Sequence, residues 1–245
     1  MLTANIDGNR SRPIPSAVGV CPFCRSEMVP RCGEVRIHHW AHKSKANCDP
    51  WREPETDWHR NWKNEFPLSW QEKIFQDEAT GERHIADVHT LSGLTVEVQH
   101  SHLDPTERRA REEFYRNMIW VVDGSRLKGN REKISEWRNT LVEISQGQSR
   151  TNLFLTDKAE ELFPNDWLEC PVPVCFDYMG PKGDVSSAPQ VLFLLYPGTV
   201  HGGRLVEPLP RGSLLRAIFA ERVDTSSVRS VTQRVARLRL SNRRR

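Results

Sequence analysis

The sequence predicts an α/β protein in which helices cover a mixed sheet and a small metal-binding module precedes that sheet. Two observations support this prediction. Between residues 54 and 144 the hydrophobic pattern changes in the order helix, hairpin, helix, strand, helix, and strands that are linked through a helix favour a mixed sheet. Ahead of this stretch, residues 21–48 contain four of the six cysteines and three of the nine histidines, a density that indicates metal binding.

Length and composition are those of an ordinary globular protein. The chain has 245 residues, of which 37% are hydrophobic and 27% are charged. These values exclude a collagenous, membrane-embedded or wholly disordered chain. No apolar run approaches the roughly 18 residues of a membrane span. The first residues contain no apolar stretch typical of a secretory signal, so we expect a cytoplasmic protein without a membrane partner.

Positive charge is concentrated at the C-terminal end. The net charge is +3, yet residues 225–245 contain seven arginines and no acidic residue, so the rest of the chain is net negative. This charge distribution excludes a protein that coats nucleic acid with a uniformly basic surface. It makes the tail the first candidate for a local contact with DNA. Two structures stay open for the tail. It is either a disordered, solubilising end or an amphipathic basic helix, because its apolar residues keep helical spacing at Val228, Val231, Val235 and Leu238.

The first elements follow from short local signals. Residues 1–20 are expected to form a loose leader. Trp58 and Trp62 are one helical turn apart and Pro54 suits the first helical position, which predicts a helix over residues 54–66.

A β-hairpin is predicted next. The runs 84–90 and 94–101 have strand character and flank the turn-like residues 91–93. Because side chains alternate along a strand, Glu97 and Gln99 share one face of the second strand.

Further elements follow in order. Asp104 and Pro105 open a helix that continues to about Arg116, and residues 118–124 form a buried strand. A later helix is indicated by helical spacing after Asn130, at Ile134, Trp137, Leu141 and Ile144. Beyond Gly147 we expect strands over 152–157 and within 191–198, a helix from Ser213, and structural roles for Cys170 and Cys175.

The cysteine and histidine cluster predicts a structural zinc site. A CxxC pair is followed by two histidines in HWAH and then by a further cysteine, and structural Zn²⁺ takes four such ligands in a tetrahedron. Without a secretion signal, closely spaced cysteines favour a metal over disulfides. The residues that compete for four places are Cys21, Cys24, Cys32, His38, His39, His42 and Cys48. The preferred set is Cys21, Cys24, one of His39 or His42, and Cys48.

The hairpin carries an acidic constellation. A metal-dependent nuclease needs carboxylates that hold Mg²⁺ beside the scissile phosphate, and a polar or basic group near the attacking water. Asp87 on the first strand, with Glu97 and Gln99 on the second, fits that layout. Alone, this pattern is common on exposed hairpins.

Several motifs, taken together, resemble those of one family. CPFC, HWAH, Cys48, the ETDWH-x3-K helix, the IADV and VEVQHS strands, the Arg-rich helix and NMIWVVDG occur over about residues 18–125. In this order they resemble the competence protein CoiA-like nuclease family. The resemblance implies a PD-(D/E)xK restriction-endonuclease-like core preceded by a zinc-binding module, with a role in processing DNA during natural transformation.

The resemblance also assigns residue roles. It makes Asp87 and Glu97 ligands of a catalytic Mg²⁺ or Mn²⁺, places Gln99 where lysine is usual, and makes Glu55, His59 and Lys63 the first-helix motif. A neutral amide cannot supply the lysine charge that stabilises developing negative charge. Lys63 or metal-bound water would then have to do so.

The expected organisation has four parts. They are a leader and zinc-binding module (1–50), a restriction-endonuclease-like nuclease core (51–148), an accessory α+β region (149–224) and an Arg-rich tail (225–245). The region from 150 to 245 is a candidate surface for a protein partner.

Three functions stay open at this point. The leading one is a Mg²⁺-dependent deoxyribonuclease that hydrolyses incoming or foreign DNA, single-stranded DNA included, in transformation or defence. The second is a non-catalytic DNA-binding or partner-recruiting module with a degenerate nuclease fold. The third is a ββα-metal nuclease whose chemistry lies at His38, His39 or His42.

Two groups of basic residues near the hairpin also have alternative interpretations. His100 and His102 either contact DNA or are polar residues at a strand end. The arginines of the helix after the hairpin either follow a phosphate backbone or form ion pairs with its glutamates. These arginines are Arg108, Arg109, Arg111 and Arg116.

Overall fold

The computed structural model describes residues 1–34, 38–44, 48–49, 51, 56–78, 80–126, 129, 134–146, 149–178, 191–222 and 225–237. The chain is divided into two compact units, Met1–His89 and Thr90–Arg245. No helix within the described ranges is long and apolar enough to cross a membrane.

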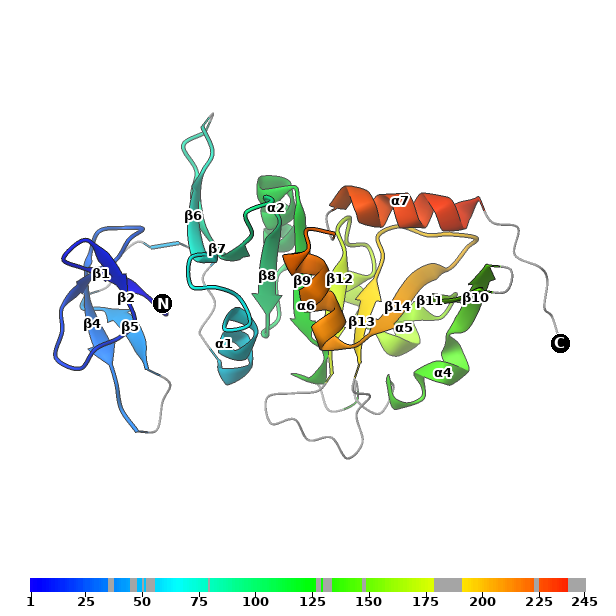
Figure 1. The fold of residues 1–245 in the computed structure, drawn as a ribbon, viewed down its shortest axis with the longest axis horizontal. Helices are drawn as coiled ribbons and strands as arrows, with labels where there is room; N and C mark the ends of the chain where they lie inside the picture. Colours follow the sequence, from blue (N-terminus) through cyan, green and yellow to red (C-terminus); the bar gives the residue numbers. More distant parts are fainter. Residues whose placement is uncertain are drawn as a thin grey trace. The chain divides into compact units, whose positions relative to one another are not determined.

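A small antiparallel sheet opens the first unit (Figure 1). Its strand order is β2-β1-β3-β4-β5. The strands are β1 (Ala4–Ile6), β2 (Asn9–Ser11), β3 (Gly19–Val20), β4 (Glu27–Arg31) and β5 (His39–His42). Buried Met1, Ala4, Cys21, Met28 and Trp40 form its core.

The expectation of a loose leader over residues 1–20 is therefore wrong. This segment supplies β1, β2 and β3, because its first apolar residues pack against Trp40. A Cβ atom at Gly19 would lie 2.8 Å from the Cβ of Ala4, so the close approach of β3 to β1 requires glycine. Such short strands carry no periodic signal that sequence analysis can detect.

The rest of the first unit consists of one helix and two strands. Helix α1 (Asp57–Lys63) begins after Thr56, whose hydroxyl accepts a hydrogen bond from the His59 amide. It lies within the predicted 54–66 helix, and Pro54 is outside the described residues. Strands β6 (Gln71–Gln76) and β7 (Arg83–His89) pair antiparallel; β6 was not predicted.

The second unit contains the mixed sheet that the sequence predicts. Its described strands follow the order β10-β11-β14-β13-β12-β9-β8. Strand β9 runs parallel to β8 and to β12, and the remaining pairs are antiparallel. The strands are β8 (Thr95–Gln99), β9 (Met118–Asp123), β10 (Val142–Gln146), β11 (Ser149–Thr156), β12 (Val174–Asp177), β13 (Leu192–Leu195) and β14 (Arg204–Leu209).

Helices and 3₁₀ turns lie between these strands or, as α6 and α7, follow the last of them. They are α2 (Pro105–Tyr115), α4 (Trp137–Thr140), α5 (Ala159–Leu162), α6 (Arg211–Phe219), α7 (Thr225–Ala236) and the 3₁₀ turns η1 (Gly124–Arg126) and η2 (Asn165–Trp167). As predicted, Asp104 caps α2, since its carboxylate accepts from the amides of Thr106 and Glu107. Helix α6 begins two residues before the predicted Ser213, without a side-chain cap.

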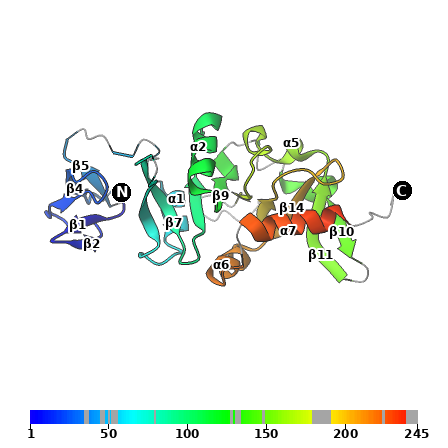
Figure 2. The same cartoon turned by 90° about the horizontal axis from the view of Figure 1, so that it is seen from above.

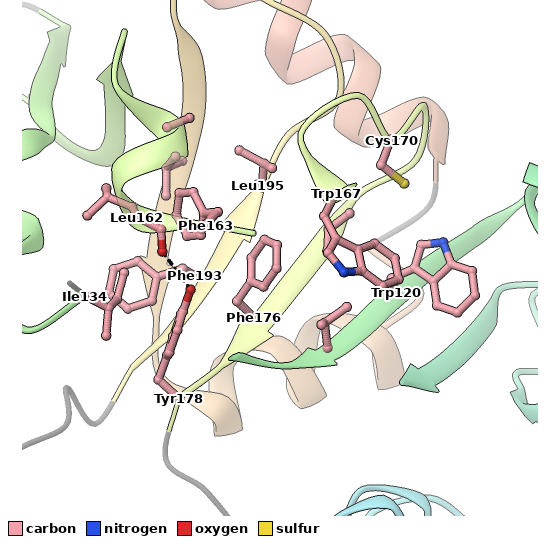
Figure 3. Close-up of a cluster of buried hydrophobic side chains, with 14 of the residues drawn as sticks. Trp120, Ile134, Leu162, Phe163, Trp167, Cys170, Phe176, Tyr178, Phe193 and Leu195 are labelled. Carbon is pink, nitrogen blue, oxygen red and sulfur yellow. Dashed lines mark hydrogen bonds between the residues drawn. The ribbon is translucent and has the colours of Figure 1, made fainter. Parts of the chain in front are cut away.

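Aromatic side chains fill the core on one face of this sheet (Figure 3). Phe163 stacks on Phe176 with ring centroids 4.9 Å apart, and the Tyr178 hydroxyl donates to the Leu162 carbonyl at 2.9 Å. A Cβ atom at Gly124 would lie 2.6 Å from the Tyr178 ring, so the turn after β9 requires glycine. Every residue of β9 is buried, as expected for a parallel strand covered on both faces.

One predicted helix ends earlier than expected. Residues 134–135 and α4 are helical, but Ile144 lies in β10. Ile134, Trp137, Leu141 and Ile144 are all buried. The apolar spacing therefore predicted burial correctly but not the end of the helix, because a helix followed by a strand satisfies the same spacing. Asn130 lies outside the described residues.

The Arg-rich tail begins as a helix. Helix α7 (Figure 2) buries Val228 and Val235, and the Val235 carbonyl lies 3.3 Å from Nε2 of His201. Of the two structures left open for the tail, the amphipathic helix is confirmed over Thr225–Ala236. Leu238 lies outside the described residues.

Candidate functional site

Four predicted zinc ligands meet in the first unit. The sulfur atoms of Cys21, Cys24 and Cys48 and a ring nitrogen of His42 all lie within 4.8 Å of one another. The Sγ atoms of Cys21 and Cys48 are 3.9 Å apart, and Sγ of Cys24 is 3.2 Å from Nε2 of His42. This is the only such group of metal-ligating side chains in the described part of the chain.

Local structure brings the ligands together. The CxxC turn closes through a hydrogen bond from the Arg25 amide to the Cys21 carbonyl at 3.0 Å, with Arg25 at a positive φ of 64°. The chain then enters β4, in which Met28 is paired with His42 of β5. A hairpin thus carries His42 back to the cysteine pair.

The distances suit a tetrahedral zinc site. Zinc–sulfur bonds of about 2.3 Å place two sulfur ligands about 3.8 Å apart, close to the 3.9 Å between Cys21 and Cys48. The hydrogen bond with Cys48 lowers the pKa of Cys21 to about 4, while the same contact raises the pKa of Cys48. Without metal, the pair therefore holds one proton, which zinc binding would release.

The other candidates are not in this group. Of the two histidines left open by the sequence, His42 is the one beside the cysteines, whereas His39 is paired with Arg31 in the sheet. His38 is exposed, and Cys32 lies outside the cluster. The third function, a ββα-metal site built from histidines, gains no support, because His42 faces three cysteines.

Asp49, which sequence analysis missed, anchors the last ligand. It follows Cys48, and its Oδ1 lies 2.9 Å from Nδ1 of His84 while its Oδ2 accepts from the Ile85 amide at 2.6 Å. These contacts tie the ligand segment to β7. The only signal in the sequence is an acid directly after a cysteine.

Asp87 has two basic neighbours from α1. Its Oδ2 lies 2.9 Å from Nε2 of His59, and its Oδ1 lies 3.5 Å from Nζ of Lys63. His59 and Lys63 are one helical turn apart, so both face β7. The structure thus brings together three of the residues that the sequence predicts for catalysis. Glu55 lies outside the described residues.

Glu72 is a buried acid that sequence analysis also missed. Its carboxylate lies 3.4 Å from Lys63 Nζ and accepts from the amides of Leu2 and Thr3 at 2.7 and 3.1 Å. Burial alone would raise the pKa of Glu72, but Lys63, the amino terminus and these hydrogen bonds together lower it to about 2. Glu72 is therefore a permanent anion beside Lys63.

Glu97 and Gln99 lie on β8 in the second unit, and both are buried. Oε2 of Glu97 is 3.2 Å from Nη1 of Arg111. The Gln99 amide donates to the Ser101 carbonyl at 3.2 Å, while its Oε1 has no hydrogen-bond partner among the described residues. A buried oxygen acceptor of this kind is the type of group that binds a cation or its bound water.

The predicted catalytic residues belong to different units. Asp87 is in the first unit, and Glu97 and Gln99 are in the second. The pairing of the two predicted hairpin strands and a metal shared by Asp87 and Glu97 therefore stay predictions.

Four of the other basic residues near β8 lie beside carboxylates. Nδ1 of His100 lies 2.8 Å from Oδ2 of Asp123, and His102 lies 3.7 Å from Asp166. Arg108 and Arg111 are buried against Glu112 and Glu97. The ion-pair interpretation therefore holds for these two arginines, whereas Arg109 and Arg116 are exposed.

A comparison with protein families supports the N-terminal assignment. The sequence model of the competence protein CoiA N-terminal domain matches residues 20–50. This match covers all four residues of the metal cluster, and it confirms the resemblance to CoiA proteins over that segment. Comparisons with curated proteins and with solved structures gave no match.

Proposed function

We propose that this protein is a metal-dependent deoxyribonuclease of the CoiA type, which hydrolyses phosphodiester bonds in incoming DNA during transformation. The observation that carries the proposal is the cluster of Asp87, His59 and Lys63. A nuclease site needs a carboxylate with a basic group near the reacting phosphate, and this cluster combines the Asp87 carboxylate with Lys63 and His59. Defence against foreign DNA would use the same chemistry.

Lys63 supplies the charge that Gln99 lacks. Its ammonium group lies between Glu72 and Asp87, at 3.4 and 3.5 Å, so two carboxylates lie beside its charge. Positive charge next to the reacting phosphate stabilises the negative charge that develops in the transition state. In this proposal Lys63 replaces the strand lysine of other nucleases.

Glu97 and Gln99 are the second half of the proposed site. They share one face of β8, and the unpartnered Oε1 of Gln99 offers a neutral ligand beside the Glu97 carboxylate. Mg²⁺ or Mn²⁺, when bound, would activate water and stabilise the phosphate charge. We propose that Asp87 and Glu97 share that ion, as the short hairpin connection in the sequence predicts.

The second candidate is a non-catalytic DNA-binding protein with a degenerate site. The ion pair between Arg111 and Glu97 favours it, because the carboxylate is already compensated without a metal. A buried arginine beside a metal ligand would lower the affinity of that ligand for a cation.

Cleavage assays separate the two candidates. Purified protein is incubated with single-stranded and duplex DNA, with and without Mg²⁺ or Mn²⁺. Asp87→Asn and Glu97→Gln keep shape and remove charge, and the exposed acids Asp157→Asn and Glu113→Gln serve as matched controls. We expect wild type and controls to cleave, and each site variant to lose at least about a hundredfold in rate, or about 2.7 kcal/mol. Absence of metal-dependent cleavage by the wild type would favour the binding protein.

A further inference from the structure

Helices α6 and α7 present an arginine-rich surface in the second unit. Its exposed arginines are Arg216, Arg222, Arg229, Arg234 and Arg237. In the described residues 211–222 and 225–237, Glu221 is the only acid. We call these five arginines and Phe219 the α6–α7 surface.

Helical periodicity explains why the arginines point outward. Leu214 and Ile218 of α6, and Val228 and Val235 of α7, are buried. Arg216 of α6 and Arg229 and Arg234 of α7 lie away from these apolar stripes, because residues three or four apart share a helix face. Arg222 and Arg237 follow the ends of the two helices. The charge is therefore displayed on the outer side of both helices.

Phe219 places an aromatic ring among these arginines. The residue is 45% exposed at the end of α6, and it lines an open depression with Arg216 and Arg222. Arg222 and Ala217 also line a neighbouring pocket of about 340 Å³, which α7 closes with Val228 and Val231. An exposed ring between arginines is the arrangement on which unstacked bases stack.

We propose that the α6–α7 surface binds single-stranded nucleic acid, with its arginines on the phosphates and Phe219 stacked on a base. The charge of the surface selects a polyanion, and its aromatic ring selects a strand whose base faces are open, since duplex bases are stacked on each other. This inference deepens the proposed function, on which it rests for DNA as the substrate. The proposed surface would bind nucleic acid without sequence preference. Sequence analysis had placed such a contact only in residues 225–245.

Binding assays with the full-length protein test the proposal. Fluorescence anisotropy is measured with a labelled single-stranded oligothymidylate and with a duplex of equal length, without added Mg²⁺ and without chelator. Phe219→Ala is compared with Leu91→Ala, which alters a more exposed apolar residue of the same unit. Arg216→Gln with Arg229→Gln is compared with Arg126→Gln, an exposed arginine of η1.

The expected results are specific to stacking and to phosphate contacts. Phe219→Ala should weaken single-strand binding about fivefold or more, and Phe219→Trp should restore it. The double arginine variant should reduce the slope of log affinity against log salt by about 1.4. Leu91→Ala and Arg126→Gln should bind like the wild type.

Three outcomes would overturn the proposal. One is wild-type affinity in Phe219→Ala, a second is equal affinity for duplex and single strand, and a third is displacement of the oligonucleotide by an acidic peptide as readily as by unlabelled DNA, which would indicate a protein partner. Loss of cleavage with intact single-strand binding would contradict the proposed function alone. A thermal melt confirms that each variant is folded.

Discussion

The ammonium nitrogen of Lys63 lies 3.5 Å from Oδ1 of Asp87, and only 3% of the lysine side chain is exposed. Burial penalises a charged group unless counter-charges lie close to it. Glu72 provides a second anion at 3.4 Å. The aspartate proposed as a metal ligand is therefore paired with a cation that its own unit holds in place.

Replacing Lys63 should affect folding and catalysis to different extents. Lys63→Gln leaves Glu72 and Asp87 without their shared cation, which should cost about 3 kcal/mol in free energy of unfolding. If Lys63 also stabilises the transition state, kcat of the folded fraction should fall by about a hundredfold. Chemical unfolding and kcat are measured on the same preparation. An unchanged kcat per folded molecule would limit Lys63 to a structural role.

Glu72 should make the first unit sensitive to acid. Its pKa is lowered to about 2 from an ordinary value of 4.5, so the carboxylate contributes stability above about pH 4.5 that is lost as the pH falls toward 2. Glu72→Gln should therefore lower the free energy of unfolding at pH 7 on the order of 3 kcal/mol, and by less at pH 3.

The comparison between variants isolates Glu72 from other acid effects. Glu65→Gln, at an exposed position, should differ little from wild type at either pH. The free energy of unfolding in urea is measured at pH 7 and at pH 3 for the wild type and both variants. Each variant is then compared with the wild type at each pH. A gap between wild type and Glu72→Gln that is equal at both pH values would contradict the assigned pKa.

Zinc should hold the five-stranded sheet together. Structural zinc contributes on the order of 10 kcal/mol to folding in small modules, so chelation should unfold the sheet around Trp40 while the second unit stays folded. Cys48→Ser should lose the metal, whereas Cys32→Ser, outside the cluster, should retain it. Elemental analysis and hydrogen exchange measure the two effects. A protein that contains no zinc after careful purification would disprove the assignment.

Sequence analysis located the cluster of three cysteines and one histidine because these residues are close in the chain. The choice between His39 and His42 depended on β5, since residues three apart in a strand point to opposite faces, and that strand had no recognisable signal. Glu72 was not predictable, because it accepts from the Leu2 amide 70 residues away. Within the second unit, capping residues predicted α2 well. The end predicted for the helix at Ile144 was wrong, because apolar spacing alone does not separate a helix followed by a strand from a longer helix.

The tail helix should contribute to folding as well as to binding. Val235 is fully buried on α7, so Val235→Asp should lower the free energy of unfolding by about 3 kcal/mol, because it buries an uncompensated charge. Arg234→Gln, at an exposed position on the same helix, should change stability by less than about 0.5 kcal/mol. Thermal unfolding checks both values. Equal stability of the two variants would mean that α7 does not pack in solution.

Arg111 and a metal should compete for Glu97. Oε2 of Glu97 lies 3.2 Å from Arg111 Nη1, so Arg111→Met leaves a buried carboxylate without its cation and should destabilise the second unit by about 3 kcal/mol. A divalent ion that binds Glu97 can replace the lost charge, and binding to the folded state raises its stability. Mg²⁺ should therefore raise the Tm of Arg111→Met by several degrees more than that of the wild type. The double variant Arg111→Met with Glu97→Gln should lose this extra gain, because no carboxylate remains to bind the ion. If Mg²⁺ stabilises both Arg111 variants equally, Glu97 is not a metal ligand and the ion pair with Arg111 is its sole role.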